Sequence, residues 1–182
     1  MVEEAKLEQT DHGVVPMSDG WFVLNARDAR WRPSEGRGAY CLFEGDPEFP
    51  QYAVHLVTLR PGEVMAMYHW EVDQEDFFVV AGEALLIVEG EERPLAQWDL
   101  VHCPAGTNHV IVGAGDGPCL VLAMGARGES TGPNWGAYTV DETARRHGAS
   151  VERETSDAAE AYARFPPREN KPFAEGGWLP KA

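Results

Sequence analysis

Two carboxylates and an imidazole near the middle of the chain have the types and spacing of ligands for a divalent metal ion. His69 and Glu71 lie two residues apart, and Glu75 follows soon after. Side chains two apart on a β-strand project from the same face, so we expect His69 and Glu71 to point the same way. Glu75 follows a short turn and precedes an apolar segment, so it can return beside them on the paired strand.

A second segment, 98–113, supplies a further imidazole. His109 opens a short apolar run directly after the turn formed by Pro104 and Gly106. Imidazole and carboxylate groups that converge from three strands at the mouth of a barrel form a typical site for a divalent ion that keeps open positions for a substrate. Spacing alone leaves this convergence open, because it depends on how the strands pair.

Short strands are needed to position these side chains, and the sequence predicts about eight of them. The runs are rich in β-branched and aromatic residues and are bounded by Gly, Pro or Asp. Seven of them span 52–59, 66–71, 76–80, 84–88, 100–103, 109–112 and 120–124. Turns about every ten residues, with no long amphipathic helix between them, indicate an all-β fold of antiparallel strands. The clearest hairpin is 84–95, where Gly90 can supply the positive φ of the turn.

The sequence divides the chain into three parts. We expect residues 1–19 to be a flexible N-terminal segment, residues 20–125 to hold the barrel with outlying strands at 21–24 and 39–43, and residues 126–182 to form a C-terminal extension.

Two short helices are expected in that extension. Asp141 can cap the first, over 141–147, and the second should begin near Thr155 or Ser156 and end at Pro166. An apolar stripe on the second helix should pack on the barrel or on another subunit. The remaining tail should be a loop.

Charge and composition exclude several functional classes. The 182 residues carry 30 Asp and Glu against 15 Lys and Arg, a net charge of −15, which opposes binding to nucleic acid or to anionic membranes. The acidic N-terminus lacks the pattern of a signal peptide, and the apolar runs are too short to span a bilayer, so we expect a cytoplasmic protein. The cysteines Cys41, Cys103 and Cys119 are widely spaced, which favours buried thiols over disulfides or a thiolate zinc site.

The stretch 62–113 resembles the two conserved motifs of the cupin superfamily, G-x5-H-x-H-x3,4-E-x6-G and G-x5-P-x-G-x2-H-x3-N. Glu75 and Gly82 match the end of the first motif, and Pro104, Gly106 and His109 match the second at the family's spacing. The resemblance implies an antiparallel double-stranded β-helix, the jelly-roll barrel of a small single-domain cupin. It also implies one divalent metal ion and, for a chain of this size, a homodimer.

Four positions depart from these motifs. Glu71 stands where the second histidine of the first motif is expected, which gives H-x-E-x3-E, and one extra residue separates Gly62 from His69. Trp98 replaces the leading glycine of the second motif, and Gly113 replaces its final asparagine. A strict count of five residues from Gly62 would instead place Tyr68 and Trp70 on the inward face of the strand. We favour the register with His69 and Glu71 inward, because turns absorb an extra residue easily.

The resemblance implies that His69, Glu75 and His109 occupy three of the family's four ligand positions, with Glu71 in the fourth. Two imidazoles and two carboxylates would suit zinc, manganese, iron or nickel. Glu71 could instead act as a general base, and the sequence leaves both roles open. Two aromatic or imidazole side chains, Phe77 and His102, are candidates for the lining of the pocket.

Two functional hypotheses follow. The first is a metalloenzyme of the isomerase, epimerase or dioxygenase type that acts on a small oxygen-rich substrate. The second is a non-catalytic module that binds or senses a small molecule or a metal. Metal identity discriminates among the reactions, because dioxygenation needs a redox-active ion.

Overall fold

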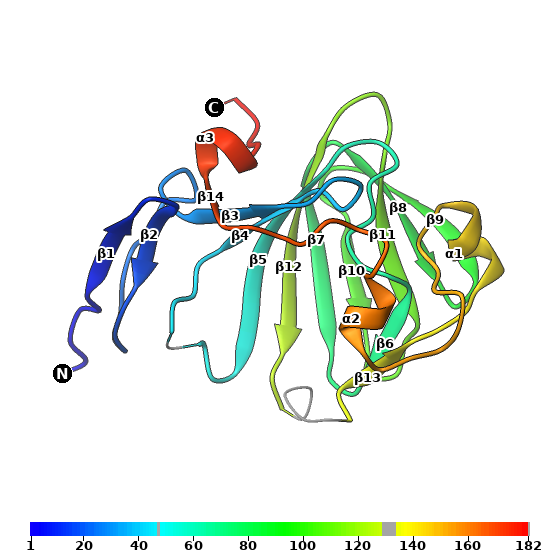
Figure 1. Cartoon of the computed structure of the whole chain (residues 1–182), viewed down its shortest axis with the longest axis horizontal. Coiled ribbons are helices and arrows are strands. Elements are labelled where there is room, and N and C mark those ends of the chain that lie inside the picture. The colour runs from blue at the N-terminus through cyan, green and yellow to red at the C-terminus, as the bar shows by residue number, and fades with distance from the viewer. Residues whose placement is uncertain (47, 129–133, 182) are drawn as a thin grey trace.

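The fold consists of two antiparallel sheets that face each other around a common interior (Figure 1). The computed structural model describes residues 1–46, 48–128 and 134–181. The larger sheet has seven strands in the order β10-β7-β12-β5-β4-β3-β14, and the smaller has five in the order β13-β6-β11-β8-β9. All pairings between the named strands are antiparallel. The prediction of an all-β antiparallel barrel with short helices is therefore confirmed.

The elements have the following bounds. The strands of the larger sheet are β3 Arg30–Pro33, β4 Ala39–Leu42, β5 Tyr52–Leu59, β7 Glu75–Ala81, β10 Leu100–Cys103, β12 Cys119–Ala126 and β14 Lys171–Pro172. Those of the smaller sheet are β6 His69–Glu71, β8 Glu83–Val88, β9 Glu91–Leu95, β11 His109–Ala114 and β13 Gly136–Tyr138. A separate hairpin joins β1 Leu7–Thr10 and β2 Gly13–Pro16, and the helices are α1 Glu142–Arg146, α2 Ala158–Ala161 and α3 Phe173–Gly176.

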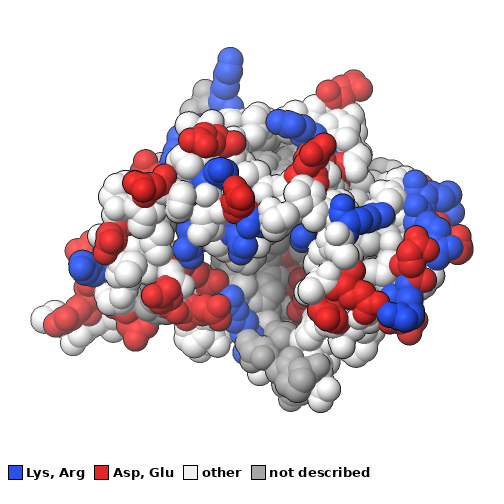
Figure 2. All heavy atoms as spheres, in the orientation of Figure 1, with Lys and Arg blue, Asp and Glu red and all other residues white. Residues whose placement is uncertain are grey.

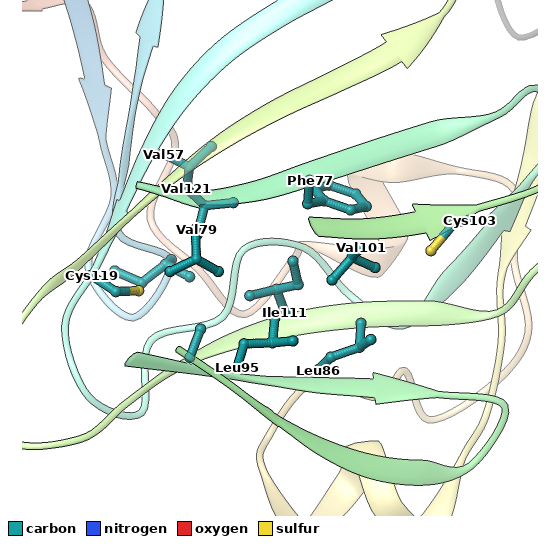
Figure 3. Close-up of a cluster of buried hydrophobic side chains, with 12 residues drawn as sticks. Val57, Phe77, Val79, Leu86, Leu95, Val101, Cys103, Ile111, Cys119 and Val121 are labelled. Carbon is teal, nitrogen blue, oxygen red and sulfur yellow. The ribbon is translucent and has the colours of Figure 1, made fainter. Parts of the chain in front are cut away.

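The core lies between the two sheets and fills one end of the barrel (Figure 3). Val57, Val79 and Val121 project from the larger sheet toward Leu86 and Ile111 of the smaller one, and all five are buried. Alternate residues of each strand point inward, which is why the β-branched runs of the sequence identify these strands. The three cysteines are buried free thiols, in β4, β10 and β12.

The hairpin of β8 and β9 forms where the sequence predicts it. Its turn residues Glu89 and Gly90 have φ values of 48° and 77°. Positive φ at both turn positions matches the twist of the flanking strands, and glycine adopts it without strain.

The C-terminal extension is only partly as expected. Asp141 caps α1, and its Oδ1 accepts a hydrogen bond of 2.7 Å from the Ala144 amide, as predicted. The second helix ends earlier than expected, because α2 stops at Ala161 and Tyr162 takes its C-cap. The tail is not a simple loop, because β14 pairs with β3 and is followed by α3.

The strands of the N-terminal part differ from those expected. Residues 1–19 contain the β1–β2 hairpin, which the sequence did not predict. Residues 21–24 form no strand, whereas β3 over Arg30–Pro33 was missed. Its sequence alternates charged residues with Trp31, so it lacks the apolar run on which strand prediction relies.

Trp98, which departs from the cupin motif, has an unusual backbone conformation. Its φ is 81°, the left-handed conformation that the motif's glycine would adopt freely, and its side chain is 65% exposed. We expect Trp98→Gly to be more stable than Trp98→Ala by about 1 kcal/mol, because both lose the contact with Phe78 and only glycine removes the strain. Urea unfolding of the two variants measures this difference, and equal midpoints would contradict it.

Candidate metal centre and its cleft

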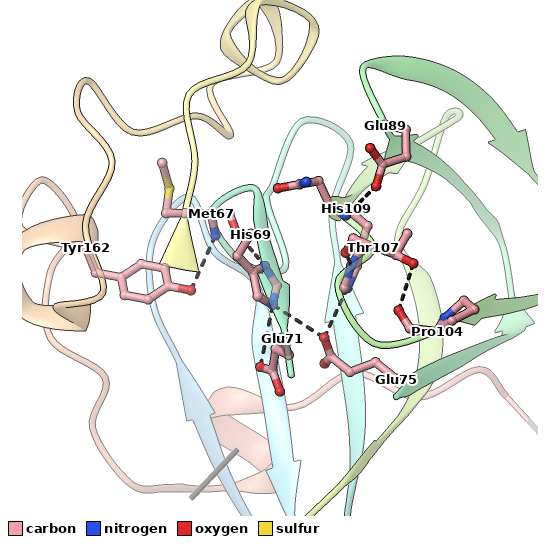
Figure 4. Close-up of polar contacts among 10 residues, drawn as sticks. Met67, His69, Glu71, Glu75, Glu89, Pro104, Thr107, His109 and Tyr162 are labelled. Carbon is pink, nitrogen blue, oxygen red and sulfur yellow. Dashed lines mark hydrogen bonds and ion pairs between the residues drawn. The ribbon is translucent and has the colours of Figure 1, made fainter. Parts of the chain in front are cut away.

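Three strands bring His69, Glu75 and His109 together. In the smaller sheet, β6 and β11 are neighbours, and His69 pairs directly with His109. Glu75 begins β7 of the opposite sheet, after a short turn from β6, and its side chain returns toward both imidazoles (Figure 4). Glu75 Oε2 lies 3.2 Å from His109 Nε2 and 3.5 Å from His69 Nε2.

Each imidazole is oriented by a backbone carbonyl. His69 Nδ1 donates to the Met67 carbonyl at 2.8 Å, and His109 Nδ1 donates to that of Thr107 at 3.0 Å. A proton on Nδ1 turns Nε2 toward the cluster, and such an outer hydrogen bond is typical of histidines that bind metals. Both Nε2 atoms therefore face Glu75.

Unpartnered polar atoms mark the centre of this cluster. Glu75 Oε2 and His109 Nε2 are buried and have no hydrogen-bond partner within the described parts of the chain. A buried polar atom without a hydrogen-bond partner is costly, so this arrangement fits the binding of a cation. One carboxylate oxygen and two imidazole nitrogens, with ligand atoms within 4.8 Å of one another, could hold a divalent metal ion.

The electrostatics of the three groups also favour positive charge between them. Burial alone would lower the pKa of His69, but the carboxylates of Glu71 and Glu75 outweigh it and raise that pKa to about 10. Burial likewise opposes the charged form of Glu75, yet the two imidazoles hold its pKa well below the usual range. A proton on an imidazole or a metal ion can supply this positive charge.

Glu71 lies at the edge of the cluster. Its Oε1 is 3.7 Å from His69 Nε2, and it is outside the group of three whose ligand atoms all lie within 4.8 Å. Glu71 nevertheless faces the same cavity as His69, which is the register favoured from the sequence. The alternative register is wrong, because Tyr68 is buried in a separate cluster behind the strand.

The cluster lies in a cleft of about 720 Å³ between the two sheets. Its wall includes Arg30, Tyr40, His55, Phe77, Arg127 and Tyr138. Figure 2 shows the hollow in this face of the molecule, with both basic and acidic side chains around it. A cleft of this size can hold a small organic molecule.

The structure separates the two residues predicted to line the pocket. Phe77 does line it, with its ring centroid 5.3 Å from that of His109. His102 does not, because its side chain is exposed on the outside of β10, where Nδ1 lies 2.6 Å from Asp76 Oδ1. Phe77 and Val101 are paired and both buried, and therefore the next residue of β10, His102, points outward.

Sequence reasoning missed several residues of the cleft, above all Arg30 and Arg32. Both lie on the unpredicted strand β3, two residues apart, and both line the cleft. The alternation of arginine with a fully buried Trp31 was the available signal. His55 also lines the cleft.

His55 should make stability depend on pH. Burial, aided by Arg127, lowers the pKa of its imidazole despite the opposing charge of Glu44. Below the ordinary pKa of about 6.5 the unfolded chain therefore binds a proton that the folded chain disfavours, so this contribution to stability is lost as pH falls. Between pH 6.5 and 5, the free energy of unfolding of the wild type should fall relative to His55→Gln by at most about 1.4 kcal/mol per pH unit. Parallel curves from urea unfolding would contradict this.

Comparison with known families agrees with the fold. A profile of the cupin domain matches residues 55–125, which contain His69, Glu75 and His109. The chain therefore contains a cupin domain over these residues. None of the curated proteins matches this cupin significantly.

Solved structures share the cupin barrel. A protein from Thermotoga maritima described as a predicted oxalate decarboxylase is 18% identical, with a TM-score of 0.52 over 58% of this chain and 98% of that chain. A polyketide cyclase from Streptomyces resistomycificus is 12% identical, with a TM-score of 0.51 over 58% and 79%. A cupin sugar phosphate isomerase from Silicibacter pomeroyi is 27% identical, with a TM-score of 0.45 over 57% of this chain. This cupin spans 62% of the length of that isomerase.

No helix in the described part of this cupin has the length and apolar character to cross a membrane.

Proposed function

We propose that this cupin is an enzyme that uses a divalent metal ion, held by His69, Glu75 and His109, to act on a small oxygen-rich molecule. The observation that carries the proposal is the convergence of two imidazole nitrogens and one carboxylate oxygen beside an open cleft, with two of these atoms buried and lacking a hydrogen-bond partner among the described residues. When bound, a divalent ion would polarise a carbonyl or hydroxyl oxygen of the substrate.

Glu71 is the residue that we propose to transfer the proton. Its carboxylate faces the cleft, lies beside the three ligands and is less tightly placed among them than Glu75. A carboxylate that reaches the substrate without binding the metal can take a proton from one carbon or oxygen and return it to another. Such proton transfer is the core of isomerase or epimerase chemistry.

The walls around the site are partly aromatic and supply one further polar group. Phe77 packs beside His109, and the Tyr138 ring centroid lies 5.8 Å from that of His69. Burial raises the pKa of Tyr138, so its hydroxyl keeps its proton at neutral pH. It can donate a hydrogen bond to a substrate oxygen in the cleft, since it also lines the wall.

The identity of the metal that the purified protein retains indicates the reaction type. Zinc or manganese would favour isomerase or epimerase chemistry, whereas dioxygenation needs a redox-active ion such as iron or nickel. Activity of the metal-loaded protein on a panel of sugars, keto acids and phenols tests the proposal. A fully loaded protein that turns over none of them would favour the non-catalytic binding or sensing function.

Glu71→Gln separates the two roles of this residue. We expect the variant to retain metal at the wild-type level and to lose activity by a factor of about 100 or more, because the amide cannot accept the proton. Glu75→Gln is the matched comparison, and it should lose the metal itself. Metal analysis and turnover are measured on the same samples. Loss of metal from Glu71→Gln would instead assign Glu71 as a fourth ligand.

The homodimer expected from the sequence stays a prediction, which light scattering of the purified protein tests.

A further inference from the structure

Four arginines gather at the end of the larger sheet, on and around β3. Arg30 and Arg32 lie two apart on this strand, so both project from the face opposite the buried Trp31. The Arg168 guanidinium donates hydrogen bonds to the backbone carbonyls of Arg32, Gly38 and Arg37. These bonds hold Arg168 beside the segment that carries Arg32 and Arg37. The four are Arg30, Arg32, Arg37 and Arg168, and we call them the arginine cluster.

The arginine cluster lacks counter-charges. None of its members forms an ion pair with a carboxylate in the described ranges, whereas Arg93, Arg145 and Arg153 on the surface all do. The Nε atoms of all four are buried and have no hydrogen-bond partner there. Burying charged donors in this way is costly unless an anion pairs with them. Glu44 and Glu48 also line the cleft, but the printed ion pairs of both are with Arg127 and not with the arginine cluster.

A neighbouring arginine shows the contrast. Arg127 also lines the cleft, but both of its terminal nitrogens bind the Glu44 carboxylate, at 2.7 and 2.9 Å. The carboxylate of Glu44 therefore balances the charge of Arg127 and accepts hydrogen bonds from both of its terminal nitrogens. Arg30 reaches only the backbone carbonyl of Glu44, at 2.8 Å, so its charge is left uncompensated.

The cluster is held in place before any ligand arrives. The guanidinium carbons of Arg168 and Arg32 lie 4.4 and 5.8 Å from the Tyr40 ring centroid, and that of Arg37 lies 3.6 Å from the Tyr162 ring centroid. Aromatic faces stabilise cations and fix their planes. Burial lowers the pKa of Arg168 to about 10, and the like charges of Arg37 and Arg32 act in the same direction.

The cleft joins the cluster to the proposed metal centre. Arg30, Arg32 and Tyr40 line the same cavity as His69, Glu75 and His109. From Arg30, successive pairing partners across the larger sheet are Leu42, His55 and Ala123. All three line the cleft between the arginine cluster and the metal centre. One end of the cavity is therefore suited to a metal ion and the other to an anion.

We propose that Arg30 and Arg32 bind the anionic group, a carboxylate or a phosphate, of the small molecule that this cleft takes. The guanidinium fork matches the oxygens of either group, and Arg37 and Arg168 add positive charge behind it. The substrate class is then an oxygen-rich anion such as a sugar phosphate or a hydroxy acid. This assignment of substrate class rests on the proposed function, but anion binding itself does not.

Calorimetric titration with inorganic phosphate and, separately, with succinate tests the inference on the full-length protein as purified. At least one of the two anions should bind, and Arg30→Gln and Arg32→Gln should each weaken that binding by about tenfold or more. Arg93→Gln, which removes an exposed arginine paired with Glu91, should leave it unchanged. Arg30→Lys and Arg32→Lys keep the charge and should bind between the wild type and the glutamine variants.

The outcomes separate the two sources of the anion. Binding of phosphate alone assigns a phosphate ester, and binding of succinate alone assigns a carboxylate. Binding that the glutamine variants, folded by circular dichroism, leave unchanged would overturn the inference, as would the absence of binding to either anion. Titration of the double variant His69→Ala/His109→Ala distinguishes the sites: anion binding lost there but kept in Arg30→Gln places the anion at the metal centre and also overturns it. Absence of metal with intact anion binding would instead count against the proposed function alone.

Discussion

Alanine at His69 or at His109 should lower the metal content of the purified protein by roughly tenfold or more. Each substitution removes one of two imidazole nitrogens from a set of three donors, and the remaining two cannot enclose the ion. The effect should be large because, among the described residues, no other imidazole belongs to the group whose ligand atoms lie within 4.8 Å of one another. Elemental analysis of protein purified in parallel measures it.

His102→Ala is the matched control for this experiment. It removes an imidazole from the same barrel, but from its exposed outer surface, where it contacts Asp76. The control should carry as much metal as the wild type. If the wild type and all three variants contained the same trace of metal, the cluster would not be a metal site, and the proposed enzyme would lose its basis.

Asparagine at Gly113 should destabilise the fold by about 3 kcal/mol or more, although asparagine is the residue of the cupin motif at this position. A Cβ atom at Gly113 would lie 2.1 Å from the backbone oxygen of Arg60. That oxygen belongs to the turn before Gly62, whose amide donates to the Gly113 carbonyl at 2.8 Å, so the two segments are held in close contact. Backbone atoms cannot move aside as a flexible side chain can.

Gly113→Ala should show most of the same loss, because the clash arises at Cβ. Gly117 supplies the control, since nothing lies within 4 Å of a Cβ built there, and Gly117→Asn should leave stability nearly unchanged. Urea unfolding of the three variants gives the differences in free energy. Equal midpoints for the Gly113 and Gly117 variants would show that the segments separate at little cost.

The departures from the motif have different physical causes. Gly113 is required by a close approach of two backbone segments, whereas Trp98 keeps the left-handed backbone of the glycine that it replaces. Glu71 keeps the inward direction of the missing histidine but stops short of the other ligands. A motif therefore describes positions in the fold, and the role of each position depends on what surrounds it.

Residue types and local periodicity were sufficient for the strands of the core and for the direction of His69 and Glu71. Alternation along a strand is a property of the backbone itself, so it can be read without knowing the partner strand. The hairpin turn at Gly90 and the cap at Asp141 were equally local, because both depend on a few adjacent residues. The family resemblance then supplied the fourfold set of candidate ligands.

Only the tertiary structure decided which distant groups meet. It separated Glu71 from the closer set of His69, Glu75 and His109, turned His102 out to solvent and brought Arg30 and Arg32 into the same cleft. These outcomes depend on strand pairing and on the packing of two sheets, which join residues far apart in the chain. The pattern within any one strand carries no information about such contacts, since the same alternation fits many partners.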